Sequence, residues 1–208
     1  LRNDEAGMDN ISLTIGKSDF KVNGVFKKIV DYFHNRGNLI ANLDIASDFV
    51  KVSDLGSSSK EDKIELDKEY MLPKNIDGKV YLNVRKLSYE GHSFFDLRGN
   101  MKLGEGQLSF PKLALRNAEA EIRGSLSIEE KLPELFLVKA NLASKSIDMK
   151  KLFSEWNNFS QNVITDKNIS GNARSSIVFE APFDLRKGII SNGIIAEVAL
   201  QIDGGRLK

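Results

Sequence analysis

The stretch LRGNMKLGEGQLSFPKLALRNAEAEIRGSLSI, at residues 97–128, decides the fold. Apolar and polar residues alternate along it, most plainly over 97–103 and 120–128. Alternation with a period of two places the apolar side chains on one face of a β-strand and the charged ones on the other. Gly104-Glu105-Gly106 interrupts the alternation, and glycine supplies the positive φ that tight hairpin turns need. The stretch therefore predicts antiparallel strands that share one apolar face.

Most of the remaining chain carries the same pattern. Alternating segments are present at 11–15, 20–22, 39–45, 50–52, 80–84, 108–115 and 136–142. Only 26–33 and 149–159 show apolar residues at helical spacing, with Ser146 or Asp148 as the N-cap of the second. Since helical crossovers between successive strands are not found, the sequence predicts a mainly β protein, an antiparallel sheet with two short helices.

The chain also resembles itself. Leu13–Gly24 matches Leu113–Gly124 at an offset of 100 positions, and Ala46–Leu55 matches Ala143–Leu152 at an offset of 97. Repeats of this kind are typical of elongated arrays, in which each unit packs on its neighbours. We therefore expect one continuous sheet array of three successive parts. These are a partial first unit over 1–75, which includes a polar connecting loop, a second unit over 76–170 and the start of a third over 171–208.

Composition excludes several classes of partner. The net charge is +1 and the basic residues are scattered, so nucleic acid is not an expected partner. Cysteine is absent, which removes disulfides and thiolate chemistry. No apolar run approaches the ~20 residues that cross a bilayer. Because the first residue is Leu and not Met, we expect the chain to be an internal segment of a longer protein.

Catalytic and metal-binding patterns are not found. The two histidines, His34 and His92, have no second histidine at the spacing of a metal site, and no Gly-x-Ser-x-Gly sequence accompanies them. The acidic pairs Glu61-Asp62 and Glu129-Glu130 are typical of solvated loops. The sequence therefore predicts a protein that is not an enzyme and takes neither a cofactor nor a metal.

An apolar sheet face must be covered, and two short helices are too little to cover it. The face can pair with a second sheet, close into a barrel or curl around an apolar ligand. The pattern alone favours a closed sandwich over a curved sheet that stays open to lipid tails.

Residues 78–156 resemble the AsmA-like proteins of Gram-negative envelopes. The resemblance rests on an ordered succession of short segments, not on one specific motif. These segments are Leu97–Leu103, Gly106–Phe110, Leu113–Leu115, Ala120–Leu126, Ala140–Ser144, Ile147-Asp148 and Leu152-Phe153. The segment 20–55 resembles the end of the same unit, and 171–207 resembles its beginning. The polar stretch 56–75 and Ala181-Pro182-Phe183 depart from the pattern.

The resemblance implies an elongated, curved antiparallel sheet, a repeating β-groove of the kind found in bridge-like lipid-transfer proteins. It implies a periplasmic location, an inner-membrane anchor outside this chain and a role in outer-membrane biogenesis. The implied partner is a phospholipid or another acyl-chain lipid on the apolar face. The candidate lining residues are Leu13, Ile15, Val22, Leu43, Ile45, Leu113, Leu115, Ala120, Ile122, Leu126, Val138 and Leu142. The alternative is a structural or adhesive β array that binds protein or glycan on its outer face, for which Tyr81 and Tyr89 are the candidate exposed aromatics.

Overall fold

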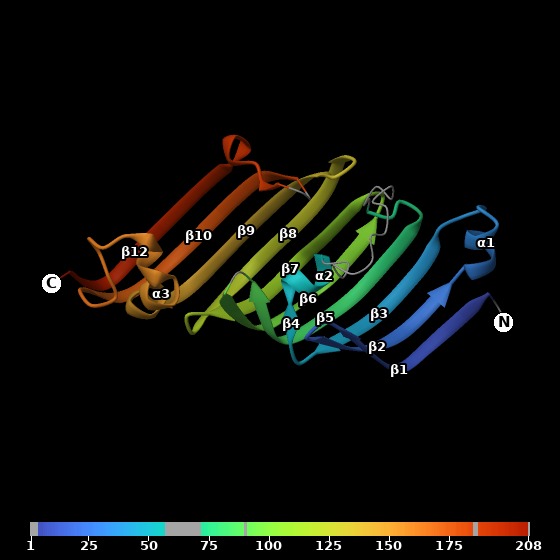
Figure 1. Cartoon of the computed structure of the whole chain (residues 1–208), viewed down its shortest axis with the longest axis horizontal. Helices are drawn as coiled ribbons and strands as arrows, with labels where there is room; N and C mark the ends of the chain where they lie inside the picture. The colour runs from blue at the N-terminus through green and yellow to red at the C-terminus, as the bar shows by residue number, and fades with distance from the viewer. Residues whose placement is uncertain (1–3, 57–71, 90, 185–186, 208) are drawn as a thin grey trace.

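The computed structural model describes residues 4–56, 72–89, 91–184 and 187–207. These residues form one open sheet of twelve strands with three short α-helices (Figure 1). The predicted mainly β class and the curved open sheet are therefore confirmed. The strands are β1 (Glu5–Ile15), β2 (Ser18–Lys27), β3 (Leu39–Ser47), β4 (Val50–Lys51), β5 (Ile76–Tyr89), β6 (His92–Gly104), β7 (Gln107–Asn117), β8 (Ala120–Leu132), β9 (Leu135–Asp148), β10 (Ile169–Asp184), β11 (Gly188–Ile189) and β12 (Ile195–Leu207). The helices are α1 (Ile29–Phe33), α2 (Val52–Gly56), α3 (Met149–Glu155) and the 3₁₀ turns Asn157–Ser160 and Ser191–Gly193.

The sheet is a meander with one interruption. Its order is β1-β2-β3-β5-β6-β7-β8-β9-β10, with β11 and β12 both paired to β10. Neighbours run antiparallel except at β5, where β3 and the short β4 both pair with it in parallel. The expectation of a purely antiparallel sheet is therefore wrong at this one junction. The chain between β3 and β5 has to return to the end of the sheet at which β3 begins.

The tight turns explain how the alternating segments become hairpins. Glu105 and Gly106, between β6 and β7, have φ values of 53° and 73°. This is the left-handed pair of a two-residue hairpin turn, at the position that the glycines predict. The β7–β8 turn uses Ala118 and Glu119 in the same region, with φ values of 49° and 60°. Left-handed backbone is unfavourable for residues with a Cβ, so this turn needs support from elsewhere in the fold.

Helix α3 supplies that support. The backbone N–H of Ala118 donates a hydrogen bond of 3.0 Å to Oε2 of Glu155, and Lys151 forms an ion pair with Glu119. The first hairpin is held in the same way, because the N–H of Lys17 donates to Oδ2 of Asp54 in α2 at 2.8 Å. In both cases an acidic side chain from a helix later in the chain binds the turn of a preceding hairpin. The division of the chain into repeat units stays a prediction.

Some local predictions are wrong. Val52, predicted in a strand, begins α2, so the described residues contain one helix more than expected. Phe26, predicted in a helix, lies in β2. Asp203-Gly204-Gly205 does not separate two strands but forms a bulge within β12, where the register to β10 shifts.

Of the two predicted N-caps, Asp148 is the N-cap of α3, and it accepts the N–H of Lys151 at 3.1 Å.

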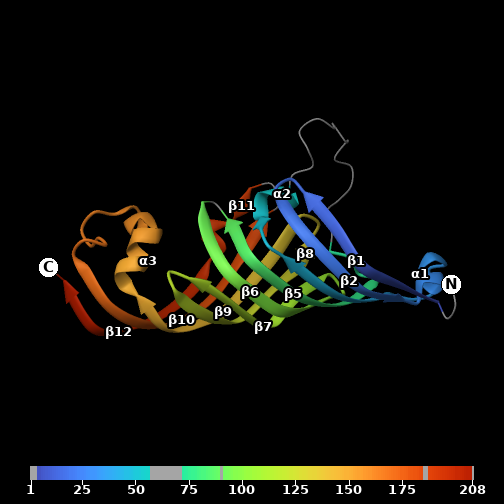
Figure 2. The same cartoon turned by 90° about the horizontal axis from the view of Figure 1, so that it is seen from below.

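The sheet curves, and the helices lie on its inner side (Figure 2). Met149 of α3 is buried with Ala120, Ile147 and Ala173 of the sheet, and Leu152 and Phe153 of the same helix pack against this cluster. Since Ala120, Ile147 and Ala173 belong to the apolar face, that face is the concave one. No second sheet covers it within the described part of the chain, so the closed sandwich that the pattern alone favours is not formed.

Candidate functional site

A single row of apolar residues crosses the whole concave face. Each member lies directly opposite the next on a neighbouring strand, so all their side chains point to the same side. We call this set the central row. It consists of Ile11, Val22, Ile45, Leu82, Gly99, Leu113, Gly124, Leu142, Ile177 and Val198. At about 4.8 Å between strands, its nine junctions span roughly 43 Å.

A second apolar row runs beside the central row. In the first half of the sheet it consists of Met8, Gly24, Leu43, Val80 and Met101. In the second half it continues as Phe110, Leu126, Ala140, Phe179 and Ala196. Neither row contains a polar side chain. The apolar surface is therefore a continuous band and not a set of separate patches.

The band stays partly exposed to solvent. Val22 and Leu113 of the central row are buried, and Ile45, Leu82 and Leu142 are half-buried. Ile11 at one end of the row and Val198 at the other are 39% and 65% exposed. Among the described residues, helix α3 covers one part of this face. An apolar surface of this length is unfavourable in water unless something apolar occupies it.

Two members of the central row are glycines that lie close to the backbone of the neighbouring strand. Gly99 and Gly124 lie on either side of Leu113. A Cβ at Gly124 would lie 1.9 Å from the carbonyl oxygen of Asn141, and one at Gly99 would lie 2.7 Å from that of Lys112. The neighbouring backbones approach so closely here that only glycine fits.

All the predicted lining residues lie on the apolar face. Val22, Ile45, Leu113 and Leu142 belong to the central row, and Leu43 and Leu126 to the second row. Leu13, Ile15, Leu115, Ile122 and Val138 flank these rows toward the strand ends. Ala120 is 2% exposed beneath α3 and so is not part of the open surface.

The prediction omitted several members of the band. Val80, Leu82 and Met101 of β5 and β6 connect its two halves, and Ile177 and Phe179 of β10 extend it. The alternation in these strands was a sufficient signal for their face, but the sequence gives no cross-strand register that would join them into one row.

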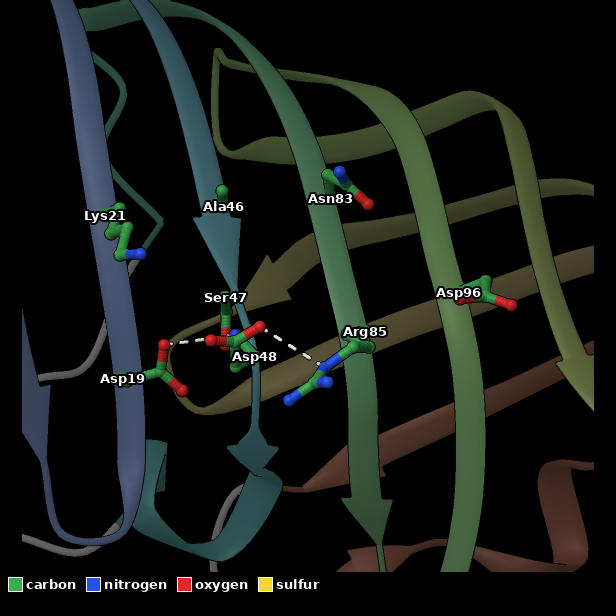
Figure 3. Close-up of a pocket in the computed structure, with 8 residues that line it drawn as sticks. All are labelled: Asp19, Lys21, Ala46, Ser47, Asp48, Asn83, Arg85 and Asp96. Atoms are coloured by element: carbon green, nitrogen blue, oxygen red, sulfur yellow. Dashed lines mark hydrogen bonds and ion pairs between the residues drawn. The ribbon is translucent and has the colours of Figure 1, made fainter.

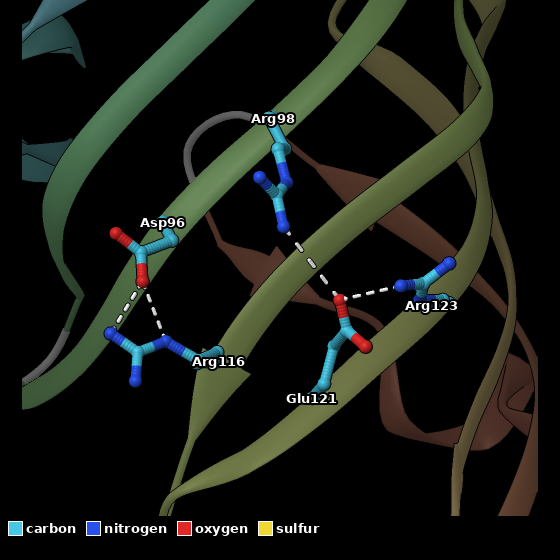
Figure 4. Close-up of polar contacts among 5 residues, drawn as sticks. All are labelled: Asp96, Arg98, Arg116, Glu121 and Arg123. Carbon is cyan, nitrogen blue, oxygen red and sulfur yellow. Dashed lines mark hydrogen bonds and ion pairs between the residues drawn. The ribbon is translucent and has the colours of Figure 1, made fainter.

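The convex face carries the charges. Asp96 pairs with Arg116, and Glu121 lies 2.9 Å from Arg123 and 3.8 Å from Arg98 (Figure 4). These side chains are exposed, so each pair contributes little to stability. One face is apolar and the other is charged, which is the pattern of an antiparallel sheet that is solvated on one face.

A hollow of about 330 Å³ opens on the polar side near the end of β3 (Figure 3). Asp19 of β2 lines it and accepts the backbone N–H groups of Asp48 and Phe49 at 3.1 and 2.8 Å. These bonds, chiefly the one from Asp48, lower the pKa of the Asp19 carboxyl below 3.8. Arg85 lies 3.3 Å from Asp48 across the same hollow.

The lowered pKa of Asp19 predicts acid sensitivity. A carboxyl with a depressed folded-state pKa stabilises the fold above its unfolded value and loses that contribution as the pH falls through the folded value. Asp19→Asn should therefore be less stable than the wild type at neutral pH, and the difference should shrink below pH 3.8. Urea unfolding midpoints of the two proteins, taken at neutral pH and below pH 3.8, measure this difference in stability. A difference that does not change with pH would contradict the assignment.

No group of three His, Cys, Asp or Glu side chains suited to a metal is present among the described residues. No helix in the same part of the chain is long and apolar enough to cross a membrane. Comparison with known protein families, curated proteins and solved structures gives no match to this chain.

Proposed function

We propose that this chain is a segment of an AsmA-like envelope protein that carries phospholipid acyl chains along its apolar concave face. The observation that carries the proposal is the central row, in which ten strands contribute an unbroken line of apolar residues or glycine. No second sheet covers this line in the described part of the chain, and Ile11 and Val198 at its two ends are exposed. A long, narrow, apolar surface fits a linear hydrocarbon better than a compact ligand.

The mechanism is physical and not catalytic. Each methylene that leaves water for the apolar band contributes about 0.8 kcal/mol, so an acyl chain gains several kcal/mol from non-directional contacts. Such contacts are similar at every point along the row, because no polar side chain interrupts it. The lipid can therefore slide from strand to strand without breaking a specific bond.

The strand ends suit the head group. Lys74, Glu105 and Lys131 are exposed and charged near the loop ends of β5 to β8. A polar head group at this rim stays in water while its tails lie across the sheet. This arrangement is consistent with a periplasmic location, with contact to the envelope membranes through parts outside this segment.

Lipid analysis of the purified chain tests the proposal. We expect native mass spectrometry to show phospholipid bound to the protein, and solvent extraction to release it. After extraction, the protein should bind lipid again when mixed with phospholipid vesicles. A protein that is purified without lipid and takes none from vesicles would contradict the proposal.

A further inference from the structure

The polar face carries a second hollow, of about 610 Å³, over the middle of the sheet. It lies on the opposite side from the apolar band and has no part in the proposed lipid transport. It is a hollow open to solvent and not an enclosed cavity. Its lining comes from β5 to β9, the same strands that form the centre of the apolar band.

The hollow exists because small residues separate long ones. Ala114 of β7 lies directly between Arg98 of β6 and Arg123 of β8, and Ala143 follows on β9. The two arginines thus stand on either side of an alanine, about 10 Å apart at their backbones. A bulge between Phe110 and Leu113 places Lys112 beside them.

The charge in the hollow is positive. Arg98, Lys112 and Arg123 line it, and no carboxylate is among its lining residues. Outside the lining, Glu121 is shared by the two arginines at 3.8 and 2.9 Å (Figure 4). Lys112 has no ion pair within the described part of the chain. Glu121 therefore pairs with two of these three cations, and most of their hydrogen-bond donors stay available.

Uncharged side chains, one aromatic ring and two amides, also line the hollow. Tyr81 lies directly opposite Asn100, which is itself opposite Lys112. Tyr81 is 43% exposed, so its ring offers a flat surface with a hydroxyl at the edge. Asn100 and Asn141 each offer amide donors and an acceptor.

We propose that this hollow binds an acidic saccharide, one that carries a phosphate or a carboxylate. The anionic group lies above Ala114, where Arg98 and Arg123 can donate to it from both sides. The sugar hydroxyls pair with the amides of Asn100 and Asn141, and the ring lies against Tyr81. Nucleic acid fits less well, because the positive charge is confined to one hollow and does not form a stripe.

Amide chemical shifts in a titration of the ¹⁵N-labelled protein test the site. The probe is glucose 6-phosphate, with glucose and inorganic phosphate as its separate halves. We expect saturable shifts at residues around the hollow, such as Asn100, Ser125 and Asn141. Glucose 6-phosphate should bind more tightly than either half, because only it uses both the arginines and the neutral groups.

Two variants and a matched control complete the experiment. R98Q/R123Q should weaken binding by about tenfold or more, since two charge-assisted contacts are lost. Ala114→Leu keeps the charges but fills the space above residue 114 in which the anionic group lies, so it should weaken binding as well. R36Q/R174Q removes two other exposed, ion-paired arginines and should leave binding unchanged. Shifts that do not saturate or lie away from the hollow, equal binding of inorganic phosphate, or equal weakening in R36Q/R174Q would each overturn the proposal.

Discussion

Leu142→Asp is expected to abolish phospholipid binding while the sheet stays folded. Leu142 is half-buried in the central row, between Gly124 and Ile177. Without lipid, an aspartate there is still reached by water, so folding is retained. An acyl chain laid across the row would remove water from the ionised carboxylate, at a cost of about 3 kcal/mol, or roughly a hundredfold in affinity. Native mass spectrometry with phospholipid measures the loss.

The next residue provides the matched control. Ala143 lies on the same strand but is exposed on the polar face, opposite Arg123 and Ser176. Ala143→Asp adds the same charge about one residue away and should leave lipid binding unchanged. Circular dichroism checks that both variants keep the β content of the wild type. Equal lipid in the Leu142→Asp and Ala143→Asp proteins would count against the apolar band as the binding surface.

Gly124→Ala should cause the largest loss of stability of any single methyl addition on the apolar face. The new Cβ would lie 1.9 Å from the carbonyl oxygen of Asn141 and 2.9 Å from Cα of Leu142. Both atoms belong to the backbone of β9, so β8 and β9 must separate and their hydrogen bonds weaken. We expect a decrease of about 3 kcal/mol in the free energy of unfolding. Urea denaturation measures it.

Gly37→Ala is the control for this substitution. A Cβ at Gly37 meets no atom within 4 Å, and its φ lies outside the left-handed range. The same methyl group should therefore change the free energy of unfolding by less than about 1 kcal/mol. If the two substitutions had equal effects, the close approach of β8 and β9 would not be a feature of the folded protein.

The sequence predicts which face each residue occupies better than it predicts which strands meet. Alternation is a local property, so the sheet face that Val80 or Leu142 occupies follows from its neighbours in the chain. The bulge in β7 between Phe110 and Leu113 is not part of the prediction, in which 108–115 is one alternating segment. The cross-strand register depends on turns and bulges throughout the sheet. The central row could therefore not be assembled from the sequence.

Other features depend on contacts distant in sequence. The left-handed backbone at Ala118 and Glu119 is stabilised by Glu155 and Lys151 of α3, which no local pattern reveals. The parallel pairing of β3 with β5 joins strands that are not consecutive in the chain, which no local pattern reveals. Whether an apolar face is covered depends on the whole fold, which is why the closed sandwich was the wrong expectation.

Nuclear Overhauser effects between acyl-chain protons and protein methyl groups test the central claim most directly, because they report only near contacts. Leu113 and Leu142 point to the apolar face, and the adjacent Ala114 and Ala143 point to the polar face. With methyl-labelled protein and bound phospholipid, we predict effects to Leu113 and Leu142 and none to Ala114 or Ala143. Effects to the alanine methyls, or bound lipid without effects to the leucine methyls, would contradict the account.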